Sequence, residues 1–108
     1  MITIHIASEF SRHPAGRFIE DGPYSGEAFR QKFLEKPLMD GETVLIDLDG
    51  TRGYGSSFLE EAFGGLVRVG LAKDRLLKSI ELRTSRQSLK QEIMEYLRSA
   101  TTMPNASV

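Results

Sequence analysis

Apolar and polar residues follow one another along the chain in patterns that predict several strands. Isoleucines alternate with polar residues over 2–6, the period of a strand with one buried face. Residues 43–48 form an almost continuous apolar run, which is typical of a strand covered on both faces. Residues 79–84 alternate again, and residues 16–20 are a shorter candidate strand that would pair with the first.

Other segments carry apolar residues at helical spacing and predict three helices. Ser25 is a suitable N-cap for a helix over 26–36, and Ser56 or Ser57 is suitable for the start of a second helix. Ser85 is a suitable N-cap for a third helix near the end of the chain. The order of strands and helices predicts an α/β fold with a mixed sheet and helices packed against it.

The second helix carries both the predicted core and an unusual pair of glycines. Gly64 and Gly65 each cost roughly 1 kcal/mol relative to Ala inside a helix. We therefore expect the helix backbone to approach a sheet or a partner closely at this pair. The core positions expected on this helix are Phe58, Leu59, Phe63 and Leu66.

Length and composition narrow the class of protein. A chain of 108 residues is long enough for one domain, which we assign to residues 1–100, followed by a flexible tail over 101–108. The absence of cysteine excludes a disulfide framework, thiol catalysis and a zinc site built on cysteine. The longest apolar run is too short to cross a bilayer, and the N-terminus lacks the pattern of a signal peptide. We expect a cytoplasmic protein that does not bind a membrane.

Charge is balanced overall but unevenly distributed. The net charge is −1, which argues against non-specific attraction to nucleic acid. Residues 1–65 carry 6 basic and 11 acidic side chains, whereas residues 66–108 carry 8 basic and 4 acidic ones. A solvated basic face is the simplest interpretation, and an acidic protein partner is the functional alternative.

Residues 44–51, Val-Leu-Ile-Asp-Leu-Asp-Gly-Thr, resemble the first motif of the haloacid dehalogenase phosphatases. That resemblance implies that Asp47 attacks phosphorus, that Asp49 protonates the leaving group and that magnesium lies between them. The chain lacks the later acidic pair that would hold the metal, and neither His5 nor His13 has a second ligand at metal spacing. We expect no metal, no cofactor and no catalytic residues, and a small phosphatase remains the alternative.

A longer segment is more specific. Residues 47–66 run from a strand-terminal Asp through a short loop to Ser-Ser-Phe-Leu-Glu-Glu-Ala-Phe-Gly at the start of a helix. With Gly-Arg-Phe at 16–18 and Tyr-Ser-Gly-Glu at 24–27, this segment resembles a STAS-like family of unknown function found in prokaryotes and their mobile elements. The resemblance covers roughly residues 14–98.

STAS domains include the antagonists of anti-sigma factors, in which a partner kinase phosphorylates a serine at the start of a helix. By this resemblance Ser56 is the phospho-acceptor, with Ser57 beside it. Gly55 replaces the aspartate of that motif, and Phe58 replaces its glycine. The resemblance implies a partner that is a histidine-kinase-like ATPase.

The residues themselves allow two roles for this serine pair. A serine at a helix N-terminus can carry a phosphate, because free N–H groups and the helix dipole favour a dianion. The simpler interpretation is that Ser56 or Ser57 caps the helix, which stabilises it by about 1 kcal/mol. The residues expected to contact a partner are Tyr54, Gly55, Ser56, Ser57, Glu60 and Glu61.

These observations favour a non-enzymatic module for protein–protein interaction, and the STAS resemblance implies regulation by serine phosphorylation. A second interpretation keeps the binding role but makes the protein an inhibitor or trigger in a mobile element or defence system. The sequence leaves homo-oligomer formation open.

Overall fold

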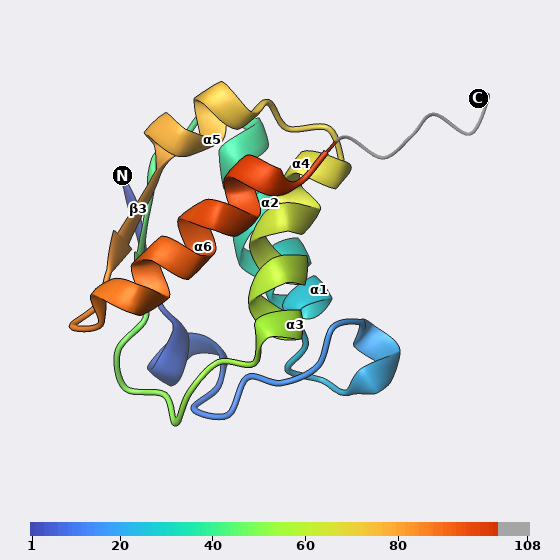
Figure 1. Ribbon diagram of the computed structural model, residues 1–108, viewed down its shortest axis with the longest axis vertical. Coiled ribbons are helices and arrows are strands. Elements are labelled where there is room, and N and C mark those ends of the chain that lie inside the picture. Colours follow the sequence, from blue (N-terminus) through green and yellow to red (C-terminus); the bar gives the residue numbers. More distant parts are fainter. Residues whose placement is uncertain (102–108) are drawn as a thin grey trace.

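The computed structural model describes residues 1–101, which form a three-stranded sheet with helices packed against it (Figure 1). The strands are β1 (Ile2–His5), β2 (Val44–Asp47) and β3 (Ile80–Arg83), in the order β1-β2-β3. Both pairings are parallel. The α/β fold class is confirmed, and the described strands make a parallel rather than a mixed sheet.

The candidate strand at 16–20 was expected to pair with β1 and does not form. Gly16 has a φ of 95°, and the segment continues into one turn of 3₁₀ helix, η2 (Ile19–Asp21). The Asp21 carboxylate accepts a hydrogen bond from the N–H of Phe18 at 2.9 Å and closes this turn. A local bond from a side chain to the backbone therefore replaces the pairing of a strand.

The first long helical segment runs from residue 26 to residue 39. Ser25 caps it as predicted, because its Oγ accepts a hydrogen bond from the N–H of Ala28 at 3.1 Å. The segment continues past residue 36 and through Pro37, following a wider π turn. Its parts are α1 (Gly26–Phe29), η3 (Arg30–Leu34) and α2 (Glu35–Met39).

The second helical segment covers residues 56–68 and contains the predicted core. All four of the predicted core side chains on this segment are fully buried, which confirms that prediction. Its parts are α3 (Ser56–Leu59), η4 (Glu60–Gly64) and α4 (Gly65–Arg68).

Three further helices complete the described chain. A π turn, η1 (Ile6–Phe10), begins where β1 ends. The charged segment α5 (Lys73–Ser79) was not predicted, because it buries only Leu76 and so shows no apolar stripe. The last helix, α6 (Gln87–Ser99), lies beside the 56–68 segment (Figure 1).

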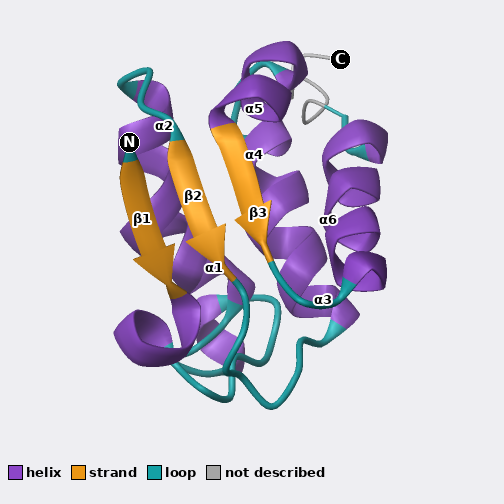
Figure 2. Ribbon diagram, turned by 90° about the vertical axis from the view of Figure 1, so that its left-hand side faces the viewer, coloured by secondary structure: helices purple, strands orange, loops and turns teal. Residues whose placement is uncertain are grey.

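The helices cover only one face of the sheet. Figure 2 shows the three strands in front of the helices. Val44 and Ile46 face the helices and are buried, whereas Leu45 and Asp47 alternate with them and are half-buried. The expectation that this strand is covered on both faces is therefore wrong for the described residues.

A close approach occurs at the glycine pair as predicted, but side chains of this chain make it, and not the sheet or partner that was expected. A Cβ on Gly65 would overlap the guanidinium of Arg30, and one on Gly64 would overlap the carboxylate of Glu60. The approaching group at Gly65 is thus a side chain of the first helical segment. Arg30 is only 5% exposed as a result.

Two further expectations from the sequence concern membrane crossing and the C-terminal tail. Within residues 1–101 the structure contains no helix that is both long and apolar enough to span a membrane. Of the tail assigned to 101–108, all but Thr101 lies outside the described residues.

Candidate functional site

The carboxyl ends of β2 and β3 bring two loops together below the sheet. The Asp49 carboxylate on the first loop accepts hydrogen bonds from the Thr84 hydroxyl and the Ser85 N–H, each at 3.1 Å. Ser85 is therefore held by the neighbouring loop, and the N-cap of α6 is Arg86 rather than the predicted Ser85. A pocket of about 340 Å³ lies between the loops and is lined mainly by Asp49, Thr51, Tyr54, Thr84, Ser85 and Arg86.

Asp47, the last residue of β2, is surrounded by hydrogen-bond donors. Its Oδ2 lies 3.1 Å from a guanidinium nitrogen of Arg83 and 3.1 Å from Nδ1 of His5. Its Oδ1 accepts the N–H of Asp49 at 3.1 Å. Burial raises the pKa of Asp47, but these hydrogen bonds outweigh that effect and leave its pKa below the ordinary value. Both carboxylates of the phosphatase-like motif are thus engaged by neighbouring residues.

No group of three histidine, cysteine, aspartate or glutamate side chains in residues 1–101 is arranged to hold a metal ion. His5 lies beside a carboxylate that also binds Arg83, and His13 lies in a loop where its N–H bonds to the Ser11 hydroxyl at 2.9 Å. The ring of His5 therefore has a carboxylate partner, whereas the bond at His13 is made by its backbone N–H.

Tyr54 was expected to contact a partner, and the structure shows that its side chain is half-buried. Its hydroxyl donates a hydrogen bond to the carbonyl of Leu48 at 2.7 Å, and its ring packs against Phe58 with centroids 5.9 Å apart. Burial raises the pKa of Tyr54 to about 12. The side chain fixes the loop after β2 to the core and is only partly available to a partner.

Ser56 and Ser57 are both exposed at the start of the 56–68 segment. Gly55 is the N-cap residue, with extended backbone angles (φ −72°, ψ 148°), and the cap includes no side-chain hydrogen bond. The simpler interpretation, that one of these serines caps the helix, is therefore wrong. Their hydroxyls face solvent at a helix start, where free backbone N–H groups gather.

The two glutamates that follow the serines are held in an ion-pair network. Glu60 accepts hydrogen bonds from Arg17 at 2.6 Å and from Arg68 at 2.6 and 2.9 Å. Glu61 is 7% exposed and bonds to Arg30 at 2.7 Å. Glu61 thus belongs to the interior. The expectation that it forms part of a partner-facing surface is therefore wrong.

No pattern in the sequence predicts this network. Its basic members come from three separate parts of the chain, namely Arg17, Arg30 and Arg68, and no sequence periodicity connects them. The only local signal was the glycine pair after two glutamates, which indicated a close approach without naming the approaching group. Hydrogen bonds from Arg68 are the main cause that lowers the pKa of Glu60, with Arg17 adding to it against the effect of burial.

A protein-family model described as a STAS-like domain of unknown function matches residues 25–88. This match covers more than half of the chain. The chain belongs to this STAS-like family. Comparisons with curated proteins and with solved structures give no match.

The match locates the candidate site within the STAS-like domain. It begins at Ser25, the N-cap of α1, and ends in the first turn of α6. It therefore includes β2, the exposed serine pair and most of the pocket. Strand β1 and the loop that carries Arg17 lie outside the matched residues.

Proposed function

We propose that this STAS-like domain is a non-enzymatic regulatory module that binds a protein partner through the loop and helix start at residues 53–60. The observation that carries the proposal is the exposed pair Ser56 and Ser57, whose hydroxyls lie at a helix start without a capping role. Gly55 leaves open space before them, because a Cβ there would meet no atom within 4 Å. A partner can therefore reach this helix start.

Phosphorylation of the helix start controls which protein the domain binds, so that the domain acts as a partner switch. A histidine-kinase-like ATPase would transfer the γ-phosphoryl group of ATP to Oγ of Ser56, releasing ADP and the hydroxyl proton. The phosphate adds about −1.5 to −2 charge at pH 7, and the first-turn N–H groups stabilise it. Glu60 lies one helical turn further along, so the new charge changes the electrostatics of the whole helix start.

Phosphopeptide mapping of the tagged protein from its native cells tests this switch. Trypsin cleaves after Arg52 and Arg68 and releases residues 53–68, whose only serines are Ser56 and Ser57. We expect one phosphate on this peptide and capture of an ATPase with the bait. An unmodified peptide under every growth condition would contradict the phosphorylation switch. Capture of a protein that is not an ATPase would support only the binding role of the domain.

A turnover assay tests the non-enzymatic part of the proposal. We expect no hydrolysis of p-nitrophenyl phosphate with magnesium, and no difference between the wild type and Asp47→Asn. If the wild type hydrolyses the substrate and Asp47→Asn does not, the protein is a phosphatase and the non-enzymatic proposal is wrong.

A further inference from the structure

The loop before α1 is closed on itself and displays a fixed surface. The N–H of Ala15 bonds to the carbonyl of Tyr24 at 2.9 Å, and the N–H of Gly26 bonds to the carbonyl of Gly16 at 2.9 Å. The N–H of Ile19 bonds to the carboxylate of Glu27 at 2.8 Å. We call residues 15–25 the closed loop. Compact loops of this kind, held by their own bonds, frequently carry binding residues.

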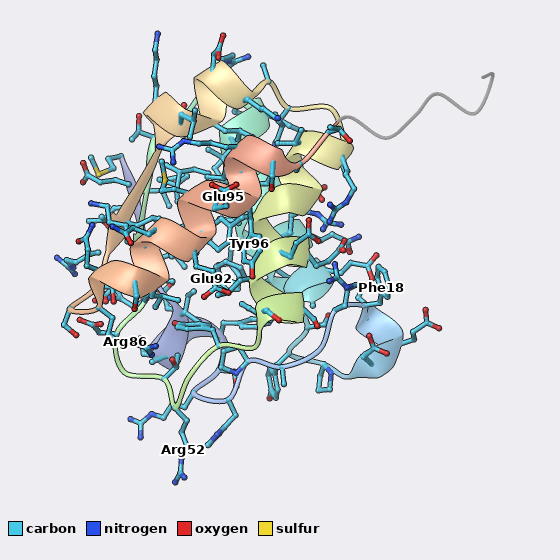
Figure 3. All side chains as sticks on the ribbon, viewed as in Figure 1. Phe18, Arg52, Arg86, Glu92, Glu95 and Tyr96 are labelled. Atoms are coloured by element: carbon cyan, nitrogen blue, oxygen red, sulfur yellow. The ribbon has the colours of Figure 1, made fainter. Side chains whose placement is uncertain are left out.

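The closed loop exposes three large apolar side chains within seven residues. Phe18 is 42% exposed, Ile19 is 50% exposed and Tyr24 is 47% exposed. Figure 3 shows Phe18 beside η2, away from the labelled residues of α6. Large apolar side chains on a pre-ordered segment are typical anchors of protein interfaces, because little conformational entropy is lost when they bind.

The charges around these side chains indicate the chemistry of the partner. Glu20 and Asp21, at the tip of the closed loop, are both exposed. The one basic residue of the loop, Arg17, turns inward and bonds to Glu60 at 2.6 Å and to Glu61 at 3.3 Å. The exposed tip is therefore apolar and acidic, and it suits an apolar pocket with basic residues at its rim.

Arg17 also connects the closed loop to the helix start. Its partner Glu60 lies four residues after Ser56, on the same face of the helix. A phosphate on Ser56 would lie one turn from Glu60 and would compete with it for the Arg17 guanidinium. Modification of the serine would thereby change the base of the closed loop.

We propose that the closed loop is a second docking surface for the protein partner, which receives Phe18 and Ile19 in an apolar pocket rimmed by lysine or arginine. This inference rests on the proposed function and adds a second contact to it. The serine pair then regulates the contact through Arg17.

Site-specific photo-crosslinking in native cells tests the docking surface directly. p-Benzoylphenylalanine replaces Phe18 in one strain and Val69 in a control strain, because Val69 is 45% exposed on a different part of the chain. We expect a crosslink from position 18 to a protein whose crosslinked peptide lies beside lysine or arginine residues, and none from position 69. No crosslink from position 18, or a crosslink to a second copy of this chain, would overturn the proposal.

Affinity measurements with the purified crosslinked partner complete the test. The double variant Phe18→Ala, Ile19→Ala should bind at least about tenfold more weakly, with unchanged circular dichroism, whereas Val69→Ala should bind like the wild type. Glu20→Lys should also weaken binding, and stronger binding would overturn the basic rim.

The same affinity measurements distinguish the docking loop from the phosphorylation switch. Weaker binding of the double variant, with no effect of Ser56→Asp, keeps the docking loop and ends the phosphorylation switch. An effect of Ser56→Asp without an effect of the double variant keeps the switch and overturns the docking loop.

Discussion

Gly65 lies where the guanidinium of Arg30 fills the space that a side chain would need. A Cβ at this position would overlap the guanidinium, which is buried and bonded to the backbone carbonyl of Glu61 at 2.6 Å. The absence of a single methyl group thus allows a charged side chain to enter the interior.

Gly65→Ala should therefore destabilise the protein, although Ala is the better helix former. The gain in helix propensity is about 1 kcal/mol, whereas forcing extra atoms into a packed interior costs about 1–3 kcal/mol. Displacement of the Arg30 hydrogen bonds adds to this cost. Urea unfolding measures the net loss, and Gln91→Ala is the control because Gln91 is an exposed position inside α6. Equal stability of Gly65→Ala and the wild type would contradict this packing.

Tyr54 gives a prediction in alkaline solution. Its folded-state pKa of about 12 lies above the ordinary value of 10.0, mainly because of burial. The folded state therefore holds the phenol proton more tightly than the unfolded state. Its contribution to stability is complete below pH 10 and is lost as the pH rises towards 12. Tyr54→Phe should flatten the fall in stability over this range, and an unchanged profile would show that Tyr54 does not cause it.

At the scale of elements, a charged network joins the two long helical segments. Arg30 from η3 bonds to Glu61 from η4, and both side chains are almost fully buried. Arg30 also donates to Glu35 at 2.8 Å, so its guanidinium has partners on both segments. Buried ion pairs contribute little net stability when intact, but removing one partner leaves an uncompensated charge.

Arg30→Met should accordingly cost at most about 3–5 kcal/mol of unfolding free energy. Glu61 stays buried without its shortest ion pair and keeps only longer bonds from Arg68 at 3.1 Å and Arg17 at 3.3 Å. The double variant Arg30→Met, Glu61→Leu should recover part of that loss, and a double-mutant cycle gives the coupling.

Lys36→Met is the control, since Lys36 pairs with Asp40 at 3.4 Å on the exposed surface. Lys36→Met should change the unfolding free energy by no more than about 0.5 kcal/mol. A similar loss in Arg30→Met and Lys36→Met would contradict the role given to burial of the Arg30–Glu61 pair.

The same network predicts a dependence of stability on acid. The pKa of Glu60 lies below its ordinary value of 4.5, mainly because Arg68 donates hydrogen bonds to it. The unfolded state therefore binds the proton more tightly than the folded state. The contribution of Glu60 is complete above pH 4.5 and is lost as the pH falls through the folded-state pKa. Glu60→Gln should show a smaller loss than the wild type between pH 5 and pH 2 in thermal unfolding.

At the scale of the whole molecule, repeating patterns predicted most of the fold. The alternation over 2–6 and the apolar run over 43–48 became neighbouring strands, because burial of one face fixes the period of the side chains. The segment α5 was missed because a helix that buries one leucine shows no such period. The strand expected at 16–20 failed because a carboxylate–backbone bond, which periodicity does not report, decided its conformation.

The candidate site was predicted less completely than the fold. The exposed serines follow from a local motif, since a helix start depends on adjacent residues. The burial of Glu61 could not be predicted in the same way, because it depends on Arg30, which lies 31 residues away in the sequence. Partners that are distant in sequence decide whether a charged side chain is inside or outside.

The most direct test of the proposed binding module is the affinity of the purified partner for Ser56→Asp, Ser56→Ala and the wild type. Ser88→Asp is the matched control, because Ser88 is an exposed serine in the first turn of another helix, α6. We predict that Ser56→Asp changes affinity at least about tenfold through added charge at the contact, with circular dichroism and melting nearly unchanged. Binding of both Ser56 variants indistinguishable from the wild type would contradict a switch at this helix start.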